Sequence, residues 1–204
     1  LKGSGFYSDP QWSPDSKKIT YVDNGRNFYI LDVASGVINQ IDADELYQPG
    51  AFRTFHGDWS SDSKWITYTK LTLTNFKQVF LYSVDEKTSY AVSDGLSDAV
   101  EPVFDRGGKY LYFLASTDAG PVVNWFDQSN ADMRMTSSVY LATLRNDILN
   151  PFARESDEEK EKKDGDEKED SKDDNDKPDE KAKEKVENIN IEFDGIENRI
   201  VNVP

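Results

Sequence analysis

The chain has 204 residues, a formal net charge of −15 and no cysteine. These values exclude disulfides and thiolate metal sites, and the acidic balance argues against a nucleic-acid binder, because such proteins present a basic face. No run of about 18 apolar residues is present, so we expect no membrane span. The chain begins with Leu1 instead of Met, and we expect it to be a piece of a longer protein.

A short lead-in, residues 1–8, precedes a stretch that is typical of a β-hairpin, WSPDSKKITY at 12–21. Proline presets the backbone for the second position of a turn, and Asp15 can bond its own backbone there. Further strands are expected at 28–32 and 37–41. The sequence therefore predicts a first unit of four strands over residues 9–54.

The same order of elements recurs twice. WSSDSKWITY follows at 59–68, and its Trp59 lies 47 residues after Trp12; FDRGGKYLYF follows 45 residues later, with Phe104 as its aromatic anchor. Four antiparallel strands in about 45 residues are typical of a β-propeller blade. We expect blades over 55–100 and 101–204; a β-sandwich with a chance repeat is the alternative.

The third unit departs from this pattern in two places. A loop insertion is expected at 116–137, and an acidic insertion at 155–187 holds 17 acids and nine lysines. Such a segment buries too little apolar surface to offset its chain entropy, so we expect it to be disordered. The run at 199–203 is the candidate fourth strand. The predicted fold is an all-β, partial β-propeller of four-stranded antiparallel blades with a long acidic insertion in the third blade.

A contact surface is the best candidate for a binding site in this chain. Long insertions in compact folds are often functional, and the loop at 116–137 carries large apolar side chains and one cation. The alternative is that these side chains pack on a neighbouring blade. The residues singled out are Trp125, Phe126, Met133, Arg134 and Met135.

The sequence predicts no catalytic residue. His56 is the one histidine of the chain, and Asp58 and Ser60 lie near it. Adjacent residues of a strand point to opposite faces, so this proximity is not a triad. Gly3-Ser4-Gly5 lacks the spacing of a nucleophile elbow.

No cofactor and no metal site are predicted either, because the acidic insertion lacks the spacing of a calcium-binding loop. Three other acids recur just before the aromatic anchors, namely Asp9, Asp58 and Glu101. We expect these carboxylates to bond the backbone or the turns of an adjacent blade.

The repeats resemble the Trp-Ser-Pro-Asp-Gly blades of TolB-type propellers, with Ser16 and Ser63 where such blades often have glycine. The third unit resembles the tricorn protease family more narrowly. The resemblance rests on SVYLATL at 138–144, NPFARESDEE at 150–159 and IEFDGIENRIVNVP at 191–204. The length of the acidic insertion departs from that family.

The resemblance implies a propeller portion of a serine peptidase that degrades oligopeptides, with the peptidase parts outside this chain. It implies a scaffold that guides a peptide substrate, a homo-oligomeric full-length protein, and a cytoplasmic location, with the periplasm as the alternative. A non-enzymatic TolB-like propeller that binds a protein partner is the alternative function, and the propeller of a prolyl-oligopeptidase-like enzyme is a third.

Overall fold

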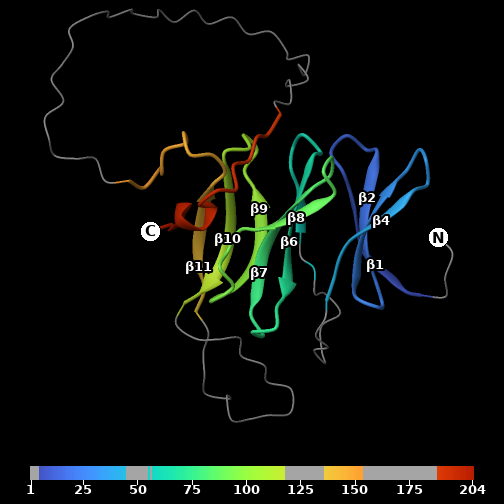
Figure 1. Ribbon diagram of the computed structural model, residues 1–204, viewed down its shortest axis with the longest axis horizontal. Coiled ribbons are helices and arrows are strands. Elements are labelled where there is room, and N and C mark those ends of the chain that lie inside the picture. The colour runs from blue at the N-terminus through green and yellow to red at the C-terminus, as the bar shows by residue number, and fades with distance from the viewer. Residues whose placement is uncertain (1–4, 45–54, 56, 118–135, 154–187) are drawn as a thin grey trace, which may run out of the picture.

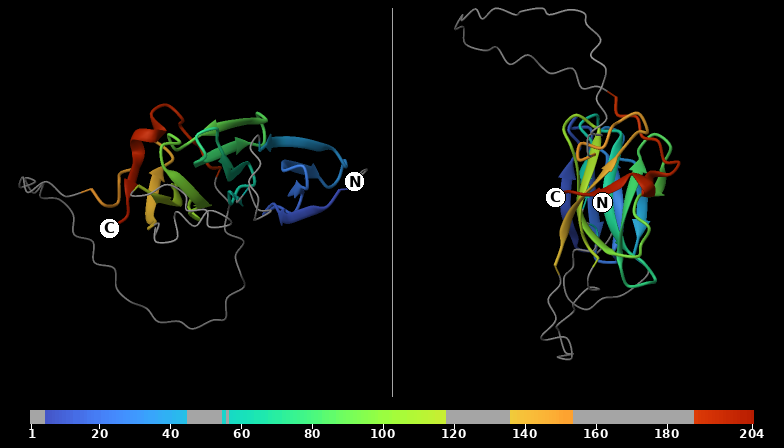
Figure 2. Two further views of the ribbon diagram at one scale, coloured as in Figure 1. Left: turned by 90° about the horizontal axis from the view of Figure 1, so that it is seen from below. Right: turned by 90° about the vertical axis from the view of Figure 1, so that its left-hand side faces the viewer.

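The computed structural model describes residues 5–44, 55, 57–117, 136–153 and 188–204, which form three antiparallel four-stranded sheets. Figure 1 shows the sheets side by side in chain order, and Figure 2 shows the same row from two other directions. This arrangement confirms the predicted all-β fold of four-stranded blades. The predicted insertion at 155–187 lies outside the described residues.

The strands of each sheet follow one another in chain order. The first sheet holds β1 (Tyr7–Trp12), β2 (Lys18–Asp23), β3 (Asn27–Asp32) and β4 (Ile38–Ala43). The second holds β5 (Gly57–Trp59), β6 (Trp65–Leu71), β7 (Lys77–Ser83) and β8 (Thr88–Ala91). The third holds β9 (Asp98–Phe104), β10 (Tyr110–Ser116), β11 (Ser138–Thr143) and β12 (Ile200–Asn202).

The last strand of the third sheet comes from a distant part of the chain. β12 pairs with β11, with Val201 opposite Leu141, as the sequence predicted for the run at 199–203. A 3₁₀ turn, η2 (Ile196–Arg199), directly precedes it. The fourth strand therefore closes the third sheet only after the chain has passed through residues 144–199.

The turn between the first two strands of each sheet is held by the side chain that follows the aromatic anchor. The Ser13 hydroxyl accepts a hydrogen bond from the Lys18 N–H at 2.9 Å, and the Ser60 hydroxyl accepts one from the Trp65 N–H at the same distance. In the third sheet Asp105 takes this place and accepts from the Tyr110 N–H at 3.1 Å. Such side-chain acceptors fix a tight turn locally.

The three sheets bury apolar side chains against one another in two layers. One cluster joins the first and second sheets through residues such as Phe28, Ile30, Ile66 and Tyr68. A second joins the second and third sheets through Val79, Leu81, Leu111 and Phe113, among others. The middle sheet is therefore apolar on both faces, as stacked blades require.

The aromatic anchors stand at the same place in each sheet but differ in burial. Trp12 pairs with Ile19, Trp59 with Ile66 and Phe104 with Leu111. The Trp59 side chain packs toward the first sheet and is 7% exposed, whereas Trp12 is 57% exposed. Each anchor faces the preceding sheet, and the described chain has no sheet before the first.

A segment that we call the strap, residues 188–199, ties the second sheet to the third. The Ile189 N–H donates to Asp62 at 2.8 Å, and the Ile189 carbonyl accepts from the Trp65 indole N–H at 3.2 Å. On the other side, the Glu192 N–H donates to the Leu144 carbonyl. The sequence indicated order at 189–193; the structure shows a non-strand segment, with Ile189 and Ile191 buried, that bridges two sheets.

Candidate functional site

The first strands of the three sheets converge on one pocket of about 210 Å³, which we call the inner pocket. Residues from β1, from the start of the second sheet and from β9 line it together, so it depends on the stacking of all three sheets. In a propeller the first strand of each blade borders the central channel. Its lining consists of Asp9, Gln11, Phe55, Gly57, Glu101, Pro102 and Val103.

Two carboxylates reach the inner pocket through equivalent backbone irregularities. Asp9 and Glu101 each stand three residues before an aromatic anchor and directly before a proline. Both have a left-handed φ, 52° and 53°, and both lie where the strand pairing shifts register. A β-bulge of this kind re-aims a side chain, and left-handed non-glycine residues gather at functional sites.

Gly57 contributes only backbone to the inner pocket, and its place allows nothing larger. A Cβ atom there would lie 2.4 Å from the carbonyl oxygen of Thr67 on the neighbouring strand. The second sheet therefore enters the pocket without a side chain at this point, while the first and third sheets each bring an acid. In the inner pocket, Asp9 and Glu101 therefore lie on either side of the Gly57 backbone.

Asp58 has a different role from the other two acids. Its carboxylate accepts the N–H of Trp59 at 2.9 Å and that of Phe104 in the third sheet at 3.2 Å. Burial raises the pKa of this carboxyl above its ordinary value, although the two N–H donors act in the opposite direction. The predicted bond to an adjacent blade is confirmed for Asp58.

The other residues singled out from the sequence lie outside the described part of the chain. This holds for Trp125, Phe126, Met133, Arg134 and Met135 of the predicted contact loop, and for His56. Within the described ranges, no group of three or more histidine or acidic side chains is arranged to hold a metal ion. Those ranges also contain no helix with the length and apolar character of a membrane span.

Sequence reasoning missed most of the inner pocket. It named Asp9 and Glu101 because they precede the anchors, but it overlooked Gln11, Phe55 and Gly57. A signal was available: Gln11, Asp58 and Val103 each stand directly before an anchor, and Asp9, His56 and Glu101 each stand three residues before one. A residue-by-residue alignment of the three copies therefore shows that Asp58 is not the counterpart of Asp9 and Glu101.

The chain is similar to tricorn-type proteases in sequence and in fold. A Sulfurisphaera tokodaii protein named as a tricorn-like protease C-terminal subunit is 25% identical over 192 residues, which is 94% of this chain and 18% of that protein. The chain thus spans about a fifth of that relative's length. The crystal structure of the tricorn protease is similar with a TM-score of 0.62 and 14% identity, over 99% of this chain and 17% of that chain.

A TolB structure from Acinetobacter baumannii is 18% identical, with a TM-score of 0.48 over 72% of this chain and 32% of that one. The sequence profile described as the tricorn protease second beta propeller domain matches residues 2–204. This match covers all three sheets and the strap. The chain belongs to the tricorn protease family, as a segment of its second β-propeller domain.

Proposed function

We propose that this segment guides peptides in a full-length serine peptidase that hydrolyses oligopeptides, without contributing a catalytic residue itself. The observation that carries the proposal is the inner pocket, in which Asp9 and Glu101 are held by matching bulges in a chain of this family. Carboxylates along a channel wall raise the local concentration of cationic ligands. Peptides with a free amino terminus or basic side chains are such ligands.

The proposal includes the organisation of the chain and of the whole protein. Residues 9–54, 55–100 and 101–204 act as three blades after a lead-in at 1–8, with insertions at 116–137 and 155–187 in the third; the first strands of the first and third blades, β1 and β9, begin slightly before these bounds, at Tyr7 and Asp98. Further blades continue the stack, because Trp12 exposes an apolar face that a preceding sheet would cover. The full-length protein is a homo-oligomer located in the cytoplasm.

Hydrolysis of matched peptides by the full-length protein tests the guiding role. The peptides have equal length and one cleavable bond, and they carry a positive or a negative net charge. Asp9→Asn with Glu101→Gln should lower kcat/KM several-fold for the positive peptide and leave the negative one unchanged or faster, since long-range attraction acts on capture. Asp85→Asn with Glu86→Gln, in an exposed turn between β7 and β8, is the matched control.

Two results would contradict this proposal. The first is a full-length protein that hydrolyses neither peptide and instead retains a protein partner, as the TolB-like alternative predicts. The second is an equal effect of the Asp9 and Glu101 substitutions on both peptides, which would leave the segment a scaffold only. Thermal unfolding of each variant, followed by circular dichroism, shows that any change in rate does not come from lost structure.

A further inference from the structure

A second cavity, of about 320 Å³, lies against the third sheet beside the connection from β8 to β9, and it shares no described lining residue with the inner pocket. Its apolar wall belongs to the third sheet, with Ala99, Phe113, Ala115 and Tyr140. Its rim carries Asp94 from the β8–β9 connection and Glu197 from η2. Serine, threonine, asparagine and isoleucine side chains complete the lining, and none of the lining residues that the structure describes is basic. We call it the rim pocket.

The repeat allows the interface between the second and third sheets to be compared with the one between the first and second sheets. In the second sheet Tyr68 pairs with Phe80, and their rings stack at 5.5 Å. In the third sheet Phe113 pairs with Tyr140 at the same place, and their rings stack at 5.9 Å. The two stacked pairs each face the preceding sheet, so the space in front of them is equivalent in the two interfaces.

In the first interface the chain itself fills that space with a ring and a cation. The Phe55 ring is 5% exposed and stacks on Phe28 at 5.3 Å, beside Tyr68 at 6.0 Å. Two residues after Tyr68, the Lys70 ammonium forms an ion pair with Asp42 of β4 at 2.7 Å. An aromatic side chain and an ammonium group therefore complete this interface.

Among the described residues of the second interface, neither group is present at the corresponding place. Ala115, two residues after Phe113, takes the place of Lys70, and Ala99 pairs with it in β9. Val79 takes the place of Phe28. A carboxylate is nevertheless present, because Asp94 follows the outer strand β8, one residue after the counterpart of Asp42. Two methyl groups stand in place of the ring and the lysine. The rim acids Asp94 and Glu197 accept hydrogen bonds from Leu96 and Asn198 and form no ion pair with another described residue.

The walls of the rim pocket are held in place by buried and partly buried hydrogen bonds. The Val79 N–H donates to the Ser93 hydroxyl at 3.1 Å, and the Lys77 N–H donates to Asp98 at 2.8 Å, so both ends of the β8–β9 connection are fixed to β7. On the other side, the Arg199 side chain donates to the Thr143 carbonyl at 3.1 Å, which holds η2 against β11. The pocket is formed before any ligand enters, which lowers the entropic cost of binding.

We infer that the rim pocket binds an aromatic side chain of a peptide together with an adjacent positive charge, either the terminal ammonium or a neighbouring basic residue. The ring lies in front of Phe113 and Tyr140 over the two alanines, at a place comparable to that of Phe55, which lies beside Tyr68 in the first interface. The charge meets Asp94 and Glu197, as Lys70 meets Asp42. This inference rests on the proposed function only in that the ligand is a peptide; the pocket and its chemistry stand without a peptidase.

The test measures binding to the full-length protein by fluorine NMR with two small probes. 4-Fluorophenylalanine amide carries the ring and an ammonium group, and N-acetyl-4-fluorophenylalanine carries the same ring with a carboxylate. We expect the amide to bind about tenfold more tightly than the acid, a difference of about 1.4 kcal/mol. Asp94→Asn with Glu197→Gln should remove most of this preference, and both side chains are exposed, so the fold should tolerate the change.

A second variant fills the cavity. Ala115→Leu should abolish binding of both probes; if it does not fold, Ser97→Phe at the half-buried rim serves the same purpose. Asp85→Asn with Glu86→Gln is the control and should bind as the unaltered protein does. The inference is overturned if the amide does not bind, if it binds Asp94→Asn/Glu197→Gln equally well, or if binding survives in the filled pocket. Probe binding by a protein that hydrolyses no peptide would refute the peptidase proposal alone.

Discussion

The carboxylate of Asp58 in the second sheet accepts the backbone N–H of Phe104 in the third sheet, 3.2 Å away and 46 residues later in the chain. Phe104 is the aromatic anchor of its sheet, so the bond joins the first strand of one blade to the anchor of the next. The other oxygen of Asp58 accepts the N–H of Trp59, its own anchor. A single side chain thus sets the relative position of two first strands.

Asp58→Ala should therefore destabilise the fold. It leaves two N–H groups without their acceptor, and a buried donor that loses its partner costs about 1–3 kcal/mol. Gln11 occupies the equivalent place in the first sheet and is exposed, so Gln11→Ala should cost little. Urea unfolding followed by tryptophan fluorescence measures both. Equal losses for the two variants would show that the contact between the sheets adds no stability.

Gly108→Ala should cost more than an ordinary substitution in a turn. Gly108 has a φ of 63°, and a Cβ atom there would lie 2.3 Å from Cγ1 of Ile189 in the strap. Gly36 has a φ of 70° with nothing within 4 Å of the added atom, so Gly36→Ala isolates the backbone cost of about 1–2 kcal/mol. Crowding of Ile189 should add about 1–3 kcal/mol for Gly108→Ala. Equal losses of unfolding free energy in the two variants would mean that Ile189 of the strap does not crowd this turn.

The first two turns have serine at the position of Gly108, where related blades often have glycine. Ser16 and Ser63 also have left-handed φ values, 60° and 61°. The Ser63 hydroxyl accepts the N–H of Asp15 in the first sheet's turn at 3.0 Å. The serine at 63 therefore makes a contact between turns that glycine cannot make, whereas Gly108 of the third turn leaves room for the Ile189 side chain.

Asp62→Ala should weaken the attachment of the strap. Asp62 accepts bonds within its own turn and also the N–H of Ile189. Asp15 makes the same turn contacts in the first sheet, with Ser13 and Lys17. The difference between Asp62→Ala and Asp15→Ala should thus be about 1 kcal/mol, the cost of losing the partly buried bond to the strap.

Hydrogen exchange of the strap amides reads out this prediction directly, since local opening raises the exchange rate. Exchange at 188–193 should rise in Asp62→Ala and stay unchanged in Asp15→Ala. If the strap exchanges equally in both variants, the Asp62 contact does not hold it.

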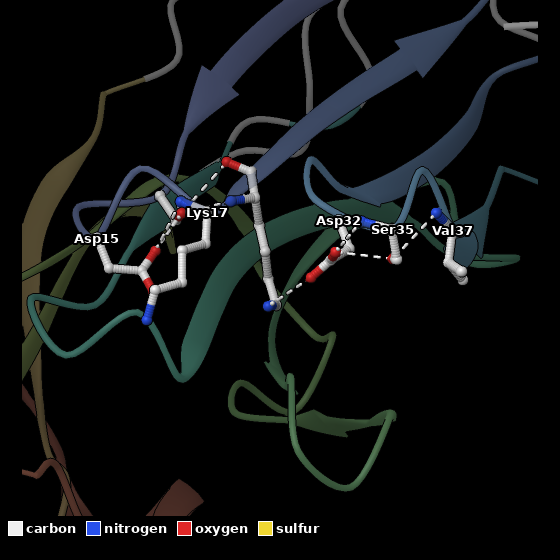
Figure 3. Close-up of polar contacts among 7 residues, drawn as sticks. Asp15, Lys17, Asp32, Ser35 and Val37 are labelled. Atoms are coloured by element: carbon white, nitrogen blue, oxygen red, sulfur yellow. Dashed lines mark hydrogen bonds and ion pairs between the residues drawn. The ribbon is translucent and has the colours of Figure 1, made fainter.

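Asp32 should give the fold a dependence on acid. Figure 3 shows the Asp32 carboxylate beside Ser35 in the turn after β3. Hydrogen bonds from the Ser35 N–H and hydroxyl, followed by the Lys18 ammonium, lower the pKa of Asp32 from 3.8 to about 2. Because the folded-state pKa is depressed, this contribution is full above about pH 4 and is lost as the pH falls toward 2.

Asp32→Asn removes that contribution at every pH. The difference in unfolding free energy between the unaltered protein and Asp32→Asn should be largest above pH 4 and shrink as the pH approaches 2. The exposed Asp85, treated in the same way as Asp85→Asn, is the control. A difference that stays constant across this range would show that the hydrogen bonds to Asp32 do not favour its ionised form in the fold.

The sequence by itself determined the local elements of this protein. The strands and their order were predicted from alternating apolar residues, from the Trp-Ser-Pro-Asp turn that begins at Trp12, and from the recurrence of this pattern along the chain. This was possible because strand period and turn chemistry depend on neighbours in the chain. The run at 199–203 was recognised as the closing strand for the same reason.

Only the tertiary structure decided where equivalent side chains of the repeats lie. Trp12 and Trp59 begin nearly identical turn sequences, yet one is exposed and the other buried, because burial depends on the sheet that lies opposite. Asp58 became a link between sheets while Asp9 and Glu101 line the inner pocket. At the rim pocket, Ala115 takes the place that Lys70 has in the equivalent interface. The effect of this difference depends on side chains from another part of the chain.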